Sequence, residues 1–436
     1  MEALERMEHY RSLFRESYGA GALPAWFARL RESAIESFTR LGFPAPGSED
    51  WKYTNVDPIA AVPFAHANGE GAALTGEIFA SAFVDVACPR LAFVNGAYSE
   101  RLSSLNGLPA GVRVASLRAA LGSNDAALET YLGRAARYRE QPFVALNSAL
   151  MEDGAVVLVP EGCRLPAPVY LVFVSTAEAK PVQSQPRNLL VLGAGSEAKI
   201  VESYIGLGTG NYFTNAVTEL FAAENAVIDH YRVQREGDRG FHVGALEAHL
   251  SNRCSFTAHA ITLGGLLVRN DLRVVLDGEG CECVLNGLYL ADGDRHVDNH
   301  TDIEHARPRT TSFELYKGIL SGSARGVFNG KIIVHKDAQK TDARQTNKNL
   351  LLSDHAVANS KPQLEIYADD VKCSHGSTIG QLDGDALFYL RSRGLAPDDA
   401  RSLLSYAFAS DVVNRVKIPA LRERLDDYLL SRFRRK

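Results

Sequence analysis

Cys373 and His375 are the two residues whose types and spacing best suit metal chemistry in this chain. A run with strand character, residues 364–367, leads into them, and glycines follow at positions 376 and 380. Residues i and i+2 of a strand project to the same face, so the thiol and the imidazole would lie side by side. A soft sulfur ligand beside an imidazole suits iron, zinc or copper(I). The alternative is a buried cysteine and a hydrogen-bonded histidine without a ligand role.

His296, His300 and His305 belong to the segment that is richest in potential ligands by count. The same segment carries the carboxylates Asp298, Asp302 and Glu304. The spacing does not match a helical HExxH zinc site, but an iron site of the facial-triad type is possible in principle. The alternative is a group of polar residues that make turn hydrogen bonds on an outer face of the fold.

Cys281 and Cys283 would also share one face of a strand, either as two ligands or as two core residues. Two earlier strands carry apolar residues at the comparable positions, namely Ala198, Ile200, Ala226 and Ile228. We therefore expect both cysteines to point into the core, and Cys254 with them. Cys88 and Cys163 have no partner motif.

The chain lacks the motifs of common nucleotide-binding enzymes and hydrolases. Gly326-Val-Phe-Asn-Gly-Lys331 is one residue short of a P-loop, and Ile332 stands where a serine or threonine must bind magnesium. The glycine-rich residues 206–210 do not open a helix, so they fail as a dinucleotide fingerprint. There is no GxSxG nucleophile elbow. The sequence predicts that the chain itself does not hydrolyse ATP.

The elements that position these residues change along the chain. Pro24 opens a predicted helix that Gly42 and Pro44 end, so the N-terminal region is expected to be helical or mixed. From about 155 to about 367, short β-rich runs follow one another between turn clusters. Strands that begin at Ala198, Ala226, Cys254 and Cys281 recur at a nearly constant interval, which favours a solenoid over a β-sandwich.

The C-terminal residues return to a helical pattern. Pro397 and Pro419 each open an amphipathic segment, and the two segments are expected to form a helical hairpin. Such a hairpin can cap the end of a solenoid with one face and present the other face to a partner.

Size and composition indicate a globular protein of two or three structural parts. The chain has 436 residues, 46% hydrophobic and 23% charged, with a net charge of −5. The acidic balance argues against nucleic-acid and membrane-surface binding, and no apolar run is long enough for a membrane span. The start lacks signal-peptide features, so a cytoplasmic location with reduced thiols is expected.

Several motifs in order resemble the SufD subunit of the SUF iron–sulfur cluster assembly machinery, a member of the SufBD family. The resemblance is dense from position 298 onward and also includes Glu49-Asp-Trp-Lys-Tyr-Thr54 near the start. Its further pieces are Asp298-Asn-His-Thr-Asp-Ile-Glu-His-Ala306, Leu315-Tyr-Lys-Gly-Ile-Leu320, Ala324-Arg-Gly-Val-Phe-Asn-Gly-Lys331, Ala338-Gln-Lys-Thr341, Asn347-Lys-Asn-Leu-Leu-Leu-Ser353, residues 361–383 and Leu387-Phe-Tyr-Leu-Arg-Ser-Arg-Gly-Leu395.

The resemblance implies a mainly β protein with a right-handed parallel β-helix core. We expect an N-terminal helical or mixed region at 1–150, the β-helix at 151–385 and a C-terminal helical domain at 386–436. In the family the histidine of the C-terminal motif lies at the contact with SufB, so His375, and with it Cys373, would sit where a nascent cluster forms. Docking of the SufC ATPase would fall to the C-terminal hairpin, through Leu403, Phe408, Leu421 and Leu425.

The implied role is that of a non-catalytic scaffold subunit. An iron–sulfur cluster usually takes about four protein ligands, so the isolated chain would hold no stable metal or cofactor. A transient cluster would form only with SufB, and a homodimer is the alternative expected for the isolated chain. Two other classes stay open at this point: a metal-dependent enzyme that uses His296, His300 and His305, and a β-helix that binds or cleaves carbohydrate.

Overall fold

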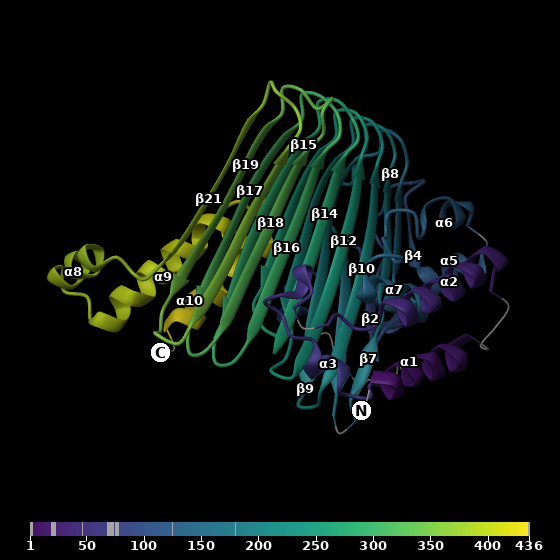
Figure 1. The fold of residues 1–436 in the computed structure, drawn as a ribbon, viewed down its shortest axis with the longest axis horizontal. Helices are drawn as coiled ribbons and strands as arrows, with labels where there is room; N and C mark the ends of the chain where they lie inside the picture. The colour runs from purple at the N-terminus through teal and green to yellow at the C-terminus, as the bar shows by residue number, and fades with distance from the viewer. Residues whose placement is uncertain are drawn as a thin grey trace.

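Most of the chain winds into a parallel β-solenoid of about eight turns, which Figure 1 shows as a stack of long strands. The computed structural model describes residues 3–18, 23–45, 47–67, 74, 78–123, 125–178 and 180–434. Successive strands of the solenoid alternate between two sheets, so each turn adds one strand to each sheet. The predicted mainly β chain with a parallel β-helix core is confirmed.

The first sheet ends at β20 and the second sheet ends at β21. The strands of the first sheet are β1 (Ala65–His66), β4 (Arg113–Ser116), β5 (Ala155–Val159), β7 (Val182–Ser184), β8 (Arg187–Leu192), β10 (Tyr212–Ala222), β12 (Gly240–Leu250), β14 (Leu267–Leu276), β16 (His296–His305), β18 (Arg325–Val334) and β20 (Val357–Ile366). The strands of the second sheet are β2 (Arg90–Val94), β3 (Ala97–Tyr98), β6 (Val169–Ala177), β9 (Glu197–Gly208), β11 (Val227–Arg235), β13 (Ser255–Thr262), β15 (Glu282–Ala291), β17 (Thr311–Leu320), β19 (Asp342–Leu351) and β21 (Lys372–Gly380).

Helices flank the solenoid at both ends of the chain. They are α1 (Ala3–Tyr18), α2 (Ala25–Leu41), α3 (Asp57–Ala60), α4 (Ile78–Ser81), α5 (Leu117–Gly122), α6 (Ala126–Tyr131), α7 (Pro142–Leu150), α8 (Gly384–Ser392), α9 (Pro397–Val413) and α10 (Pro419–Arg434), with two 3-10 turns at Glu49–Trp51 and Glu100–Leu102. The predicted N-terminal helix is α2, which begins after Pro24 and ends at Gly42, where φ is +68°. None of the described helices is long and apolar enough to cross a membrane.

The register of the sheets is set by rows of side chains that alternate between the inside and the outside. Cys254 stacks on Cys281 from one turn to the next, as the sequence interval predicts. One step of the predicted register is wrong, because Ala198 pairs with Ile228 and not with Ala226. The stretch from Ala198 to Ile228 spans 30 residues, two more than the stretch from Ile228 to Phe256, and the extra length lies in β9, which has 12 residues where β11 has 9.

The main core lies between the two sheets and consists of their inward-facing apolar side chains. Cys254, Cys281 and Cys283 are 1%, 0% and 0% exposed within it, so their predicted core placement is confirmed. Three further clusters cover the outer faces. The N-terminal helices pack on the first sheet, and the C-terminal helices pack on the second, behind the strands in Figure 1.

The C-terminal hairpin lies along the side of the solenoid and not across its end, which differs from the expected cap. Val412, Leu421 and Leu425 are buried against outward-facing residues of four successive turns, from Tyr231 to Ile319. An additional helix, α8, precedes the hairpin and projects away from the strands (Figure 1). The last turn of the solenoid therefore stays uncovered. The domain limits at residues 150 and 385 stay a prediction.

Candidate functional site

The uncovered last turn consists of β20 and β21, the edge strands of the two sheets. Among the described residues, no strand pairs with the outer side of either one. Every residue of β21 is exposed except Cys373, which is partly buried. Edge strands present unpaired N–H and C=O groups, and proteins normally cover them or pair them with another chain. The site predicted from the sequence thus lies on an open edge.

Cys373 and His375 occupy β21 and belong to the inward-facing rows of the second sheet. Cys373 pairs with Ala343 and packs against the main core, while the exposed His375 pairs with Gln345. Each of the two side chains is therefore the last one of an inward-facing row, at the end of the solenoid that is open to solvent. Burial raises the pKa of the Cys373 thiol above its ordinary value. The thiol is protonated at neutral pH. It can act as a ligand only when a metal ion or a neighbouring cation stabilises the thiolate.

The three histidines of the alternative metal site do not come together. All three lie on β16, but His296 and His300 point outward whereas His305 points inward, because residues alternate along a strand. His305 is fully buried between the hydroxyls of Thr310 and Ser312, at 2.7 and 2.9 Å. No group of three or more His, Cys, Asp or Glu side chains within the described residues could hold a metal ion.

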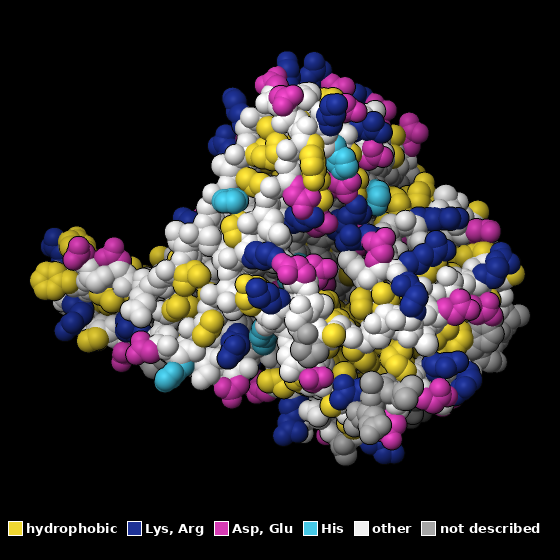
Figure 2. Space-filling view, in the orientation of Figure 1, with side chains coloured by type: hydrophobic (Ala, Val, Ile, Leu, Met, Phe, Trp, Pro, Cys, Tyr) yellow, Lys and Arg dark blue, Asp and Glu magenta, His cyan; other side chains and the backbone are white. Residues whose placement is uncertain are grey.

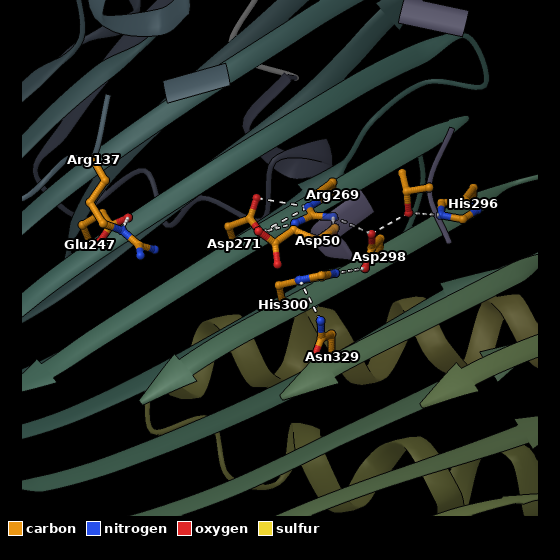
Figure 3. Close-up of polar contacts among 10 residues, drawn as sticks. Asp50, Arg137, Glu247, Arg269, Asp271, His296, Asp298, His300 and Asn329 are labelled. Carbon is orange, nitrogen blue, oxygen red and sulfur yellow. Dashed lines mark hydrogen bonds and ion pairs between the residues drawn. The ribbon is translucent and has the colours of Figure 1, made fainter. Parts of the chain in front are cut away.

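His296 and His300 instead take part in a hydrogen-bond network around Asp298 on the outer face (Figure 3). The buried Asp298 contacts His300 Nε2 at 3.0 Å and Arg269 at 3.1 Å, and it accepts a hydrogen bond from Thr54 Oγ1 at 2.5 Å. The same hydroxyl lies 2.8 Å from His296 Nε2. Burial alone would raise the pKa of Asp298, but His300, Arg269 and the hydrogen bonds hold it well below its ordinary value.

This network fastens the N-terminal segment to the solenoid. The guanidinium of Arg269 lies 3.8 Å from the centre of the Trp51 ring and donates to the backbone oxygen of Asp50 at 2.6 Å. Trp51 and Thr54 both come from the short N-terminal motif that contributes to the resemblance. The motif is therefore a docking segment for the outer face of β14 and β16.

A groove of about 290 Å³ opens beside this network, and Figure 2 shows a hollow with side chains of both charges around it. Arg137 and Arg273 lie between Glu247 and Asp302, so the charges largely neutralise one another. Burial raises the pKa of Glu247 to about 7, although both arginines oppose the shift. The groove has a balanced charge, and nothing in its lining selects one class of ligand.

Comparisons with known proteins agree with this architecture. Residues 4–171 match the family model described as the SufBD protein N-terminal region, and residues 173–408 match the SUF system FeS cluster assembly SufBD core domain. The chain belongs to the SufBD family. An iron–sulfur cluster assembly SufBD family protein of Synechocystis is 34% identical over 405 residues, covering 91% of this chain and 88% of that protein.

Two relatives of this SufBD-family chain carry the name iron–sulfur cluster assembly protein SufD. The one from Escherichia coli is 31% identical over 393 residues, covering 90% of this chain and 89% of that protein. The one from Bacillus subtilis is 25% identical over 418 residues, covering 92% and 93%. The likeness therefore extends over nearly the whole length and includes the open end with Cys373 and His375.

The four residues expected to bind an ATPase partner do not share one surface of this SufBD-family chain. Leu421 and Leu425 are 0% and 1% exposed, because they seat α10 on the second sheet. Phe408 is partly buried, and the ammonium of Lys317 lies 4.5 Å from the centre of its ring. Leu403 is 45% exposed. Leu421 and Leu425 therefore stabilise the helical hairpin, and a role of the four residues in partner binding stays a prediction.

Sequence reasoning missed the most exposed aromatic residues of the C-terminal region. Phe388 and Tyr389 on α8 are 73% and 57% exposed, and no residue of that helix is buried. Two adjacent aromatic residues on a short polar helix were the available signal. It also missed Glu314 and Gln345, which lie inside the solenoid next to the candidate site. The sequence does not indicate whether an isolated polar residue of a strand points into the core.

Proposed function

We propose that this chain is a non-catalytic scaffold subunit for iron–sulfur cluster assembly, which pairs with a SufB-type partner through the open end of its solenoid. One observation carries the proposal: the uncovered edge strand β21 holds both Cys373 and His375. A partner that extends the sheet at β21 would bring its own ligands to these two residues. A nascent cluster, the cargo of the complex, would then be shared between the subunits.

The backbone of β21 supports pairing at this edge. The Lys372 N–H donates to Thr341 O, so in a parallel ladder the N–H and C=O groups of residues 373, 375, 377 and 379 face the free side. By the same alternation, the N–H and C=O groups of the even-numbered residues of β20 face the free side of that strand. One of these residues is Pro362, which has no N–H. The edge of β21 is therefore the more complete template for another strand.

Apolar residues near the open end would add to the contact. Ile379, Ile366 and Tyr367 are 48%, 41% and 62% exposed. Burying such side chains together with strand pairing is the usual basis of edge-to-edge association. A second copy of this chain could use the same edge when the partner is missing.

The SufC ATPase would bind at the C-terminal helices, on the surface formed by Phe388, Tyr389 and Leu403. These are the exposed large hydrophobic residues of that region, whereas the buried apolar side chains of α9 and α10 hold those two helices to the sheet. All six cysteines are unpaired, which fits the reducing cytoplasm that we propose as the location. We propose no role in nucleic-acid or membrane binding.

Co-purification with SufB and SufC tests the pairing. Ser377→Pro removes a donor from the free side of β21 without removing a bond to β19, and Ser377→Ala is the matched control. The alanine variant should retain SufB, and the proline variant should lose it while SufC binding persists. Undiminished SufB binding by a folded proline variant would show that the partner docks elsewhere. A wild-type chain that forms only homodimers in the presence of SufB would also contradict the proposal.

A further inference from the structure

We propose that Gln345, held by Glu314, positions the imidazole of His375 at the open end of the solenoid. This inference rests on the function proposed above for His375 and adds the side chains that set the orientation of its ring. It concerns residues inside the solenoid, one and two strands away from the edge.

The three residues form a single inward-facing row across β17, β19 and β21. Glu314 pairs with Gln345, and Gln345 pairs with His375. Glu314 and Gln345 are 4% and 2% exposed. Gln345 Nε2 donates a hydrogen bond to Glu314 Oε2 at 2.8 Å. Gly330 on the opposite sheet leaves room for this amide, because a Cβ added there would lie 2.2 Å from Gln345 Nε2.

The row ends in a hydrogen-bond acceptor without a donor. Gln345 Oε1 is buried and has no partner among the described residues. The amide nitrogen is committed to Glu314, so the carbonyl oxygen is the group left to satisfy. The next side chain in the row is His375, on a strand only about 4.8 Å away, and its ring carries an N–H donor.

A hydrogen bond from the ring to Gln345 Oε1 would determine which nitrogen of His375 stays free. One ring nitrogen carries the proton and donates inward, and the other presents its lone pair toward the open edge. Metal-binding histidines commonly donate their second ring N–H to a carbonyl or carboxylate, which fixes both the tautomer and the ring orientation. Gln345 would thus be a positioning residue, and Glu314 would hold Gln345 in place.

The tautomer of His375 can be measured in the full-length chain without any partner. We suggest NMR of the chain with ¹⁵N-labelled histidine at about pH 8.5, well above the ordinary histidine pKa. The exposed His355 serves as an internal reference, and His375→Gln assigns the signal. We expect the tautomer ratio of His375 to differ from that of His355 by about fivefold, as one modest hydrogen bond would produce.

Two variants distinguish positioning from a general effect on structure. Gln345→Met keeps the size of the side chain but removes the acceptor, and it should bring the ratio of His375 to that of His355. Asn347→Leu changes the neighbouring inward row, which faces Ser377, and it should leave the His375 ratio unchanged.

Equal ratios for His375 and His355 in the wild-type chain would overturn the inference, and so would a Gln345→Met chain that keeps the skewed ratio. Either result would leave the proposed cluster role of His375 intact, because that role is judged by cluster content of the complex. The proposed function would instead be rejected if the His375→Ala variant assembled clusters normally, even where the wild-type chain showed the skewed tautomer ratio.

Discussion

Cys283 and Cys373 occupy the same inward-facing row of the second sheet, with Ser312 and Ala343 between them. Cys283 is fully buried, and burial raises the pKa of its thiol well above the ordinary value. Cys373 is at the end of the row, where the solenoid opens to solvent. A cysteine in this row is therefore a core residue on β15, and three turns later, on β21, it is a thiol at the open end.

Replacing Cys281 and Cys283 together by alanine should reduce stability without reducing cluster assembly. Each change removes one buried sulfur, at a cost of roughly 1 kcal/mol in the free energy of unfolding. Denaturant unfolding measures the loss, and iron–sulfur assembly at a permissive temperature measures the function. Cys373→Ala is the control with little effect on stability. A folded double variant that had lost assembly would indicate a sulfur-handling role for the buried pair.

Thr54→Val should loosen the N-terminal segment from the solenoid. The substitution keeps the shape of the side chain but removes the hydroxyl that donates to the buried Asp298. Leaving a buried carboxylate short of one donor costs about 1 to 3 kcal/mol. Limited proteolysis and denaturant unfolding should both report the change. Thr130→Val is a suitable control, since that hydroxyl contacts only the exposed backbone of α6, and an equal effect of both variants would contradict the docking role.

His259 should make the protein sensitive to acid. Its ring is buried against Tyr231, and neither nitrogen has a hydrogen-bond partner within the described part of the chain. Burial, then Lys417 and Arg415, lower its pKa to about 3. The folded state therefore binds this proton less readily than the unfolded state does. Its stability is full above the ordinary histidine pKa of about 6.5 and falls as the pH drops toward 3.

His259→Phe keeps the ring stacking and removes the titrating group. At pH 7 the variant should be at least as stable as the wild type. Between pH 7 and about pH 5 the wild type should lose roughly 2 kcal/mol more than the variant does. Unfolding curves at several pH values give both slopes, and parallel slopes would show that His259 binds its proton equally well in the folded and the unfolded state.

Phe388 and Tyr389 should contact SufC directly, whereas α10 should affect SufC binding only through the packing of the C-terminal helices. Deletion of residues 419–436 would expose the apolar outer face of the second sheet, so a loss of binding would reflect disturbed packing. The double change Phe388→Ser and Tyr389→Ser leaves this packing intact because both side chains are exposed. Titration of SufC should show at least tenfold weaker binding, about 1.4 kcal/mol. Tyr98→Ser, an exposed aromatic at the other end, is the control, and unchanged affinity of the α8 variant would reject this surface.

The strand-rich segment, its turn interval and the buried cysteines could be predicted because strand periodicity and apolar rows are local properties of the sequence. The side on which the C-terminal hairpin packs could not be predicted, since it depends on outward residues such as Tyr231 and Ile319 from turns far apart in the chain. The separation of His305 from His296 and His300 follows from their place on one strand. A turn, which was one alternative for this segment, would not impose such an alternation.

Cluster content of the purified complex tests the central claim most directly. The complex of this chain with SufB and SufC would be reconstituted with iron and sulfide without oxygen, and bound iron and sulfide would be counted for wild type, His375→Ala and His355→Ala. His355 is also exposed and lies on a turn of the same region, so its replacement controls for the loss of a surface imidazole. The account predicts that His375→Ala retains both partners but loses most of the cluster, while His355→Ala matches the wild type. Full cluster content in the His375→Ala complex would contradict the account.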